Sequence, residues 1–182
     1  MAAGARPRWE ALFADLEAQF AAHEQAVRDG EVAELTRAEQ ASIPLGDRLR
    51  AVVGAPVGLE LLDGEAVAGT LRTVAASWLL IEGRGAHGPT EHLVPIAAIG
   101  AVTGLRRQGA PSTSRVDSLG LGTALREVQR DRARVLVRTL GGQAVGRLAR
   151  VGQDHLDLEE ADRAPVTLRT VPFSALLRVS RA

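Results

Sequence analysis

The spacing of hydrophobic residues changes near residue 56 of this chain. Before that point, apolar residues recur every three to four positions, as in Trp9, Leu12, Phe13, Leu16 and Phe20, which is the pattern of one apolar helix face. After it, apolar and polar residues alternate, as in Val57, Leu59 and Leu61, which is the pattern of a half-buried strand. The pattern therefore predicts a helical front followed by a β-rich remainder.

The helical front is expected to contain three segments. The first begins at Arg8 and ends at the turn-forming pair Asp29-Gly30. The second covers about 31–41, and the third runs from about 44 to 53 and stops at Gly54-Ala55-Pro56. We expect the apolar face of the first helix to pack against the rest of the chain, with self-association of this face as the alternative.

Five short strands are expected after residue 56. Asp63-Gly64 indicates a tight hairpin, and Gly69 indicates a bend or a close backbone approach. Residues 83–90 are rich in turn formers and are expected to form a loop. Pro95 cannot donate a ladder hydrogen bond, so the fourth strand should end there in a short helical turn. The expected strands cover about 57–61, 66–74, 78–82, 91–95 and 100–105.

The second half of the chain repeats this order of a short helix and five strands. VPIAAIGAVT at 94–103 is echoed by VPFSALLRVS at 171–180, and LGDRLRAVV at 45–53 by LGTALREVQ at 121–129. From Gly69 and Gly146 onward the two copies align without a gap at an offset of 77. Over the first strand and its hairpin turn the offset is 78, which places the missing residue of the second copy on the strand after that turn. Such a match predicts an internal duplication.

The residues of the first hairpin and its second strand resemble the first motif of Sm-like domains. The matching positions are Asp63, Gly64, Gly69, Leu71 and Val74, and in the second copy Gly142, Gly146, Leu148 and Val151. The resemblance covers roughly 45–105 and 119–180 and implies a small barrel of the Sm-like or SH3-like type. The whole chain also resembles a protein family of GC-rich bacteria, which implies no mechanism.

The expected fold is mainly β with an N-terminal α segment, as two tandem five-stranded Sm-like or SH3-like barrels, each preceded by a short helix. Because barrels of this type leave strand edges that pair with other strands, two arrangements are open: the copies join into a pseudo-twofold unit, or they stand apart. Residues 106–118 are polar and rich in Gly, Pro and Ser, which is typical of a linker. The predicted division is a helical segment 1–43, a first barrel 44–105, this linker, and a second barrel 119–182.

The RNA-binding residues of Sm-like proteins do not carry over to this chain. The family binds RNA through an Asp and an Asn, and the corresponding positions here hold Ala75 and Leu79, or Gly152 and Leu156 in the second copy. The family's Arg-Gly pair is also missing before the last strand of either copy. The resemblance thus implies the fold without that RNA site.

Arginines in the second copy are nevertheless candidate nucleic-acid contacts, because arginine–phosphate contacts dominate affinity for nucleic acids. Residues 106–182 hold fourteen arginines against eight acids, whereas residues 1–44 hold four arginines against eight acids. The uneven charge is explained either by a nucleic-acid face or by attraction between the two ends of the chain. The candidate residues are Arg126, Arg130, Arg132, Arg134, Arg138, Arg147 and Arg150.

Composition and motifs predict neither a catalytic residue nor a metal or cofactor site. The chain has no Cys, and of its four histidines, His23, His87, His92 and His155, only His87 and His92 lie close in sequence; two histidines alone are a poor ligand set. The run SLGLG before the second short helix lacks the third glycine of a dinucleotide-binding fingerprint and follows no strand. We therefore expect that the protein is not an enzyme.

The expected function is a non-enzymatic binding or scaffold protein that contacts a protein partner through an edge strand or the helical segment. Self-association through the N-terminal helix or the barrel edges is a further expectation. The alternative is an RNA- or DNA-binding regulatory protein that uses the arginine-rich second barrel. Without a secretory signal or an apolar run of membrane-spanning length, the expected location is the bacterial cytoplasm, with no membrane partner.

Overall fold

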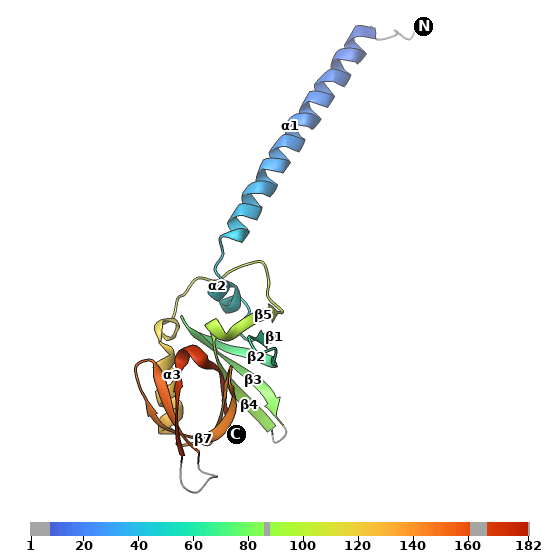
Figure 1. Cartoon of the computed structure of the whole chain (residues 1–182). Coiled ribbons are helices and arrows are strands. Elements are labelled where there is room, and N and C mark those ends of the chain that lie inside the picture. The colour runs from blue at the N-terminus through green and yellow to red at the C-terminus, as the bar shows by residue number, and fades with distance from the viewer. Residues whose placement is uncertain (1–7, 86–87, 161–166, 182) are drawn as a thin grey trace. The chain divides into compact units, whose positions relative to one another are not determined.

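The computed structural model of the chain describes residues 8–85, 88–160 and 167–181 (Figure 1). The side chains of Trp9 and Val32 lie outside this description, as does His87 of the predicted loop. The chain divides into two compact units, residues 1–43 and 44–182. Each unit is described separately below.

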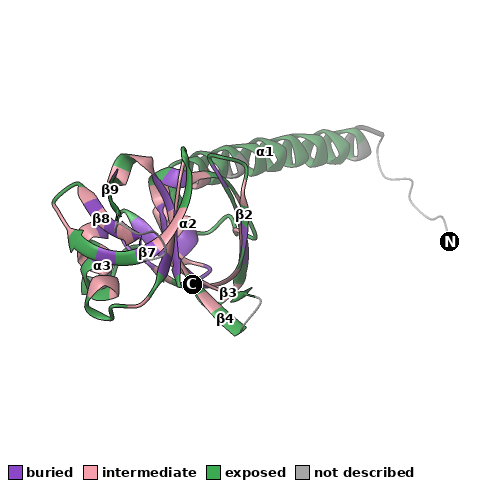
Figure 2. Ribbon diagram, turned by 60° about the horizontal axis from the view of Figure 1, so that its bottom comes forward, coloured by how far each residue is buried: buried purple, intermediate pink, exposed green. Residues whose placement is uncertain are grey.

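The first unit contains one long helix, α1 (Arg8–Ala41). The predicted break at Asp29-Gly30 is wrong, because the helix continues through both residues. Helical neighbours on either side outweigh the single unfavourable glycine, which costs only about 1 kcal/mol relative to alanine. Figure 2 shows the helix exposed along its described length. Phe13 is 61% exposed and Phe20 is 69% exposed, so packing of this face against the rest of the chain stays a prediction.

The second unit begins with the short helix α2 (Leu45–Arg50), which lies within the predicted segment 44–53. Two of its arginines hold the predicted linker: Arg48 Nε donates to the carbonyl of Arg106 at 3.1 Å, and Arg50 Nε to that of Ala110 at 3.2 Å. The linker also contains a short 3₁₀ turn, η2 (Arg115–Ser118). Residues 106 and 110 are therefore tied to the body of the unit.

The first five strands follow the predicted order with one difference. The predicted loop 83–90 is shorter than expected, because β3 continues to Gly85 and β4 begins at Gly88. Cross-strand pairs such as Gly83 with Thr90 extend this hairpin despite its glycines. Pro95 is followed by the expected helical turn. The elements are β1 (Pro56–Leu61), β2 (Ala66–Val74), β3 (Trp78–Gly85), β4 (Gly88–Pro95), η1 (Ile96–Ala98) and β5 (Ile99–Thr103).

The second half repeats these elements in the same order. A helix precedes five strands, and a 3₁₀ turn again separates the last two. The elements are α3 (Leu121–Arg130), β6 (Val135–Thr139), β7 (Gly142–Val151), β8 (His155–Glu160), β9 (Thr167–Pro172), η3 (Phe173–Ala175) and β10 (Leu176–Arg181).

The ten strands form a single open sheet with the order β5-β1-β2-β3-β4-β10-β6-β7-β8-β9. Two separate barrels are therefore not confirmed, since each half contributes five strands to the same sheet. The halves meet where β4 pairs with β10, through Leu93 with Val179 and His92 with Ser180. This contact joins the fourth strand of one copy to the fifth strand of the other. A twofold would make this contact reciprocal and also pair β5 with β9, but these are the two edge strands of the sheet, so the pseudo-twofold alternative is not supported.

The buried side chains form two hydrophobic cores, one centred on each half. Leu177 of β10 is buried in the first core, although it belongs to the second copy. Conversely, Ala75, Trp78 and Leu93 of the first copy are buried in the second core. The indole of Trp78 also donates to the carbonyl of Leu119 at 2.9 Å. The two halves therefore exchange core side chains across the contact between β4 and β10.

Glycines at equivalent positions permit close packing of the second and third strands of each half. A Cβ on Gly69 would lie 2.3 Å from the carbonyl oxygen of Glu82, and a Cβ on Gly146 would lie 2.2 Å from that of Glu159. The close approach predicted at Gly69 is thereby confirmed in both copies.

The missing residue of the second copy lies in its hairpin turn, not on the following strand. Glu60 pairs with Ala66 in the first hairpin, and Arg138 pairs with Gln143 in the second. Counting back from Gly69 and Gly146, residues of β2 and β7 already correspond at an offset of 77. Equivalent residues used below follow this register: 78 up to the turn and 77 after it.

Among the described helices, none is long and apolar enough to cross a membrane.

Candidate functional site

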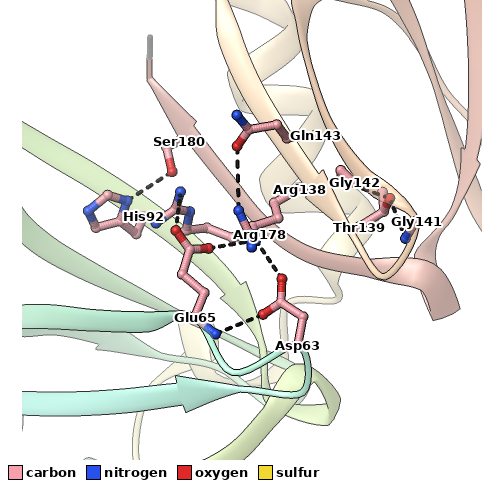
Figure 3. Close-up of polar contacts among 10 residues, drawn as sticks. All are labelled: Asp63, Glu65, His92, Arg138, Thr139, Gly141, Gly142, Gln143, Arg178 and Ser180. Carbon is pink, nitrogen blue, oxygen red and sulfur yellow. Dashed lines mark hydrogen bonds and ion pairs between the residues drawn. The ribbon is translucent and has the colours of Figure 1, made fainter.

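The contact between the two halves is made by a cluster of ion pairs at the first hairpin (Figure 3). Arg138 Nε in β6 lies 2.5 Å from Asp63 Oδ2 and 2.8 Å from Glu65 Oε2. Arg178 Nη2 in β10 lies 3.1 Å from Glu65 Oε1. The hydrogen bond from Arg138 holds the pKa of Asp63 below its usual value. Two arginines of the second copy thus neutralise two carboxylates of the first.

His92 in β4 completes the polar side of this contact. Its Nδ1 and the Ser180 hydroxyl of β10 are hydrogen-bonded at 2.9 Å (Figure 3). Burial, together with the nearby charge of Arg178, lowers the pKa of His92 to about 4. The imidazole is therefore neutral near pH 7, and the hydrogen bond is between two uncharged groups.

The apolar side of the contact surrounds the side chain of Leu177. A bulge between Leu176 and Arg178 interrupts the regular alternation of β10. Leu177 is fully buried in the first core, together with side chains of the first hairpin, β4 and η1. These neighbours in the core include Leu59, Leu61, Val67, Val94 and Ala98. A strand from one copy is thus held by the hairpin and the fourth strand of the other.

The second copy contains an equivalent space, which no strand of the described residues occupies. A groove of about 310 Å³ lies between the β6–β7 hairpin and β9. Five of its lining residues are equivalent to the five neighbours of Leu177 named above. They are Val137, Thr139, Ala144, Val171 and Ala175. We call this space the β9 groove.

Smaller side chains line the β9 groove than line its counterpart in the first copy. Val137 replaces Leu59, Thr139 replaces Leu61, and Ala144 replaces Val67. The change from Leu to Val removes one carbon, the change from Val to Ala removes two, and the change from Leu to Thr removes one carbon and exchanges another for oxygen. The groove therefore has room for a side chain from outside the second copy.

β9 is an edge strand of the sheet, so one of its sides is not paired with another strand among the described residues. Unpaired strand edges carry free backbone donors and acceptors and are templates for strand addition. Its Leu168 is 58% exposed. Arg169, which replaces His92, lies 2.5 Å from the buried Glu160 through its Nε. The unpaired backbone edge of β9 thus lies beside the β9 groove.

The seven candidate arginines are spread over the second copy. Arg126 and Arg130 lie on α3, and Arg147 and Arg150 lie on β7. Arg132 and Arg134 precede β6, whereas Arg138 lies near the other end of that strand. Arg138 is bound at the contact between the halves, separate from the arginines before β6. Val135 pairs with Gly146, so the hairpin register places Arg134 near Arg147 and Arg138 apart from them.

The partners of these arginines differ. Arg130 pairs with Glu127 on the same helix, and Arg126 Nη2 donates to the carbonyl of Gly152 at 3.3 Å. Arg132, Arg147 and Arg150 are exposed and form no ion pair with a carboxylate of the described residues. Their role in binding nucleic acid stays a prediction.

A larger groove, of about 840 Å³, lies on the first copy beside the β3–β4 hairpin. Its described lining is rich in glycine, and Glu82 and Arg84 are its ionisable side chains. Glu82 is engaged by Arg72, whose Nη2 lies 2.5 Å away. The described lining therefore contains no pair of groups arranged for nucleophilic or acid–base chemistry.

No protein-family model matches the chain, and no curated protein matches it at a significant level of sequence similarity.

Proposed function

We propose that the protein is a non-enzymatic binding or scaffold module that recruits a protein partner by strand addition at β9. The observation that carries this proposal is the β9 groove, which repeats the lining of the seat that β10 occupies in the first copy. A chain that already uses such a seat internally has the geometry needed to hold a strand. We place the protein in the cytoplasm as part of the same proposal.

The proposal includes a fold assignment. We infer that each half is an open Sm-like or SH3-like unit derived by duplication. The support is the shared order of helix, four strands, 3₁₀ turn and fifth strand, and the shared strand neighbours β5-β1-β2-β3-β4 and β10-β6-β7-β8-β9. The equivalent glycines Gly69 and Gly146 add a matched packing feature.

Site-directed photo-crosslinking in the native cell tests the binding function. A benzoylphenylalanine at Leu168, which is 58% exposed on β9, is expected to cross-link to a protein other than this chain. The matched control is the same group at Val53, which is 48% exposed and lies before β1, away from the groove. If Leu168 gave no protein cross-link, or gave the same products as Val53, the proposal would be overturned.

The second candidate function is nucleic-acid binding by the arginines of the second copy. Exposed Arg132, Arg147 and Arg150, which lack carboxylate partners among the described residues, favour it. A gel-shift titration of RNA and of DNA at rising salt tests this candidate. Binding that weakens steeply with salt and is lost on R132A/R134A would support it over the protein-binding function. Failure to bind either nucleic acid at low salt would exclude it.

A further inference from the structure

We propose that the β9 groove accepts a strand from a different protein, carrying a leucine or larger apolar residue followed by an uncharged one. This inference rests on the proposed binding function and names the partner's chemistry. It derives from comparing the residues around the seated β10 with their equivalents around the open groove.

The apolar requirement comes from the position of Leu177. In the first copy this side chain is fully buried between the hairpin and β4. The equivalent space in the second copy is lined by shorter side chains, including Thr139 and Ala144, and has a volume of about 310 Å³. A leucine fills such a space only in part, so a phenylalanine is expected to bind at least as well.

The uncharged requirement comes from the position of Arg178. In the first copy the carboxylate of Glu65 receives this guanidinium at 3.1 Å. The residue equivalent to Glu65 is Gly142, so the β9 groove offers no acid at this place. An arginine on the partner strand would lose its solvent shell without gaining a counter-charge, which disfavours it.

The position of Ser180 supplies a third preference. Ser180 meets His92 in the first copy, and the equivalent of His92 is Arg169, whose side chain is 52% exposed. A residue with a hydrogen-bond acceptor is favoured there, because a guanidinium offers donors alone. Serine, threonine, asparagine and aspartate meet this requirement.

A second copy of this chain does not meet these requirements. Its edge strand other than β9 is β5, the equivalent of β10, and the residue in the place of Leu177 is Gly100. Gly100 has no side chain that could enter the β9 groove. Thr103, in the place of Ser180, already donates its hydroxyl to the carbonyl of Gly58 within its own half, at 3.4 Å. The groove is therefore matched to a foreign strand better than to β5.

The test is an NMR titration of the ¹⁵N-labelled full chain with synthetic peptides. The probe has the sequence of residues 174–181 with the change Arg178→Gln. The comparison peptides keep this change and carry Leu177→Phe or Leu177→Gly, and a fourth peptide retains Arg178. We expect chemical-shift changes on β9 and the β6–β7 hairpin. The Leu and Phe peptides should bind at least ten-fold more tightly than the Gly peptide, and the Gln peptide more tightly than the Arg peptide.

Variants of the protein that fill the β9 groove, compared with a variant outside it, provide the matched control. Ala144→Leu places a side chain in the groove and should abolish peptide binding, whereas Ala149→Leu on the same strand, outside the groove lining, should leave it unchanged. Ala175→Leu is a second filling variant, in case Ala144→Leu unfolds the chain. Equal binding of the Gly and Leu peptides, or shifts confined to β4 and β10, would overturn the inference.

Two further outcomes separate this inference from the proposed function. Sedimentation that shows self-association abolished by Ala144→Leu would identify a second copy as the occupant and overturn the inference. A protein cross-link from Leu168 without discrimination between the Leu and Gly peptides would overturn the inference and leave the binding function supported. Absence of the cross-link would instead overturn the proposed function.

Discussion

Arg178 and Glu65 lie 113 positions apart in the sequence, yet their side chains form an ion pair of 3.1 Å across the contact between the two halves. Both side chains are largely withdrawn from solvent, with 13% and 23% of their surface exposed. Because Arg138 reaches the same carboxylate, the pair belongs to a network instead of standing alone. This network fixes the position of β10 against the first hairpin.

Breaking the pair between Glu65 and Arg178 should reveal a strong coupling. In a double-mutant cycle of Glu65→Gln and Arg178→Met, we expect a coupling free energy of about 1–3 kcal/mol in urea unfolding. Glu65→Gln removes the carboxylate that Arg178 contacts, whereas Arg178→Met leaves Glu65 with Arg138 alone. The control cycle uses Arg72 and Glu82, which are 51% and 38% exposed. Its coupling should stay below about 1 kcal/mol. Equal couplings in both cycles would contradict the assigned burial.

Truncation of Leu177 should destabilise the first half through a residue of the second. Leu177→Ala is expected to lower the free energy of unfolding by about 2–5 kcal/mol, since the side chain is fully buried. Leu168→Ala, at a position that is 58% exposed, should change it by less than about 0.5 kcal/mol. Hydrogen exchange provides the sharper measurement. Protection should fall in β1 and β4 for Leu177→Ala, and loss confined to β6–β10 would speak against the exchanged core.

Acidification should weaken the fold through His92. The unfolded imidazole takes up a proton near its ordinary pKa of 6.5, whereas the folded one does so near 4. The unfolded state therefore binds more protons between these values, and stability should fall as the pH drops from 6.5 toward 4. Above pH 6.5 His92 contributes no slope. Chemical denaturation at several pH values should show this slope reduced in His92→Gln and retained in His23→Gln, and an unchanged slope in His92→Gln would refute the assignment.

A methyl group at Gly146 should disrupt the packing of β7 on β8. The added Cβ would lie 2.2 Å from the carbonyl oxygen of Glu159, a backbone atom that cannot turn aside. We expect Gly146→Ala to cost about 1–3 kcal/mol or more, as overpacking does elsewhere. Gly120→Ala is the control, since nothing lies within 4 Å of its added Cβ. Thermal unfolding of the two variants gives the comparison, and equal midpoints would contradict the close approach.

Local sequence patterns predicted the strands of both copies well. Alternation of apolar residues and the turn at Asp63-Gly64 placed β1 and β2, and Pro95 placed the 3₁₀ turn before β5. The prediction failed where long-range pairing decides the structure. Residues 83–85 read as a loop by composition, but pairing with β4 makes them strand. The single sheet was missed for the same reason, because nothing local specifies which edge of one copy meets the other.

The candidate site was beyond local reasoning, although its signal is present in the repeat. Aligning the two copies shows Leu61 against Thr139 and Val67 against Ala144, which means that the second copy has smaller residues at positions of one core. The smaller residues can be interpreted as a groove only with the structure, which shows that Leu177 fills the equivalent space in the first copy. The arginine cluster, in contrast, was visible in the sequence. Its separation into Arg138 at the contact and the remaining residues elsewhere required the fold.

Replacing the glycine within α1 should strengthen that helix. Gly30 lies inside Arg8–Ala41, and nothing is found within 4 Å of a Cβ added to it. Glycine in a helix interior costs about 1 kcal/mol relative to alanine, so Gly30→Ala should slow amide exchange in the helix and raise the helical signal in circular dichroism at elevated temperature. Ala26→Gly, one turn earlier, should have the opposite effect. If Gly30→Ala lowered the helical signal, the break that local composition predicts at Asp29-Gly30 would be the better description of this segment.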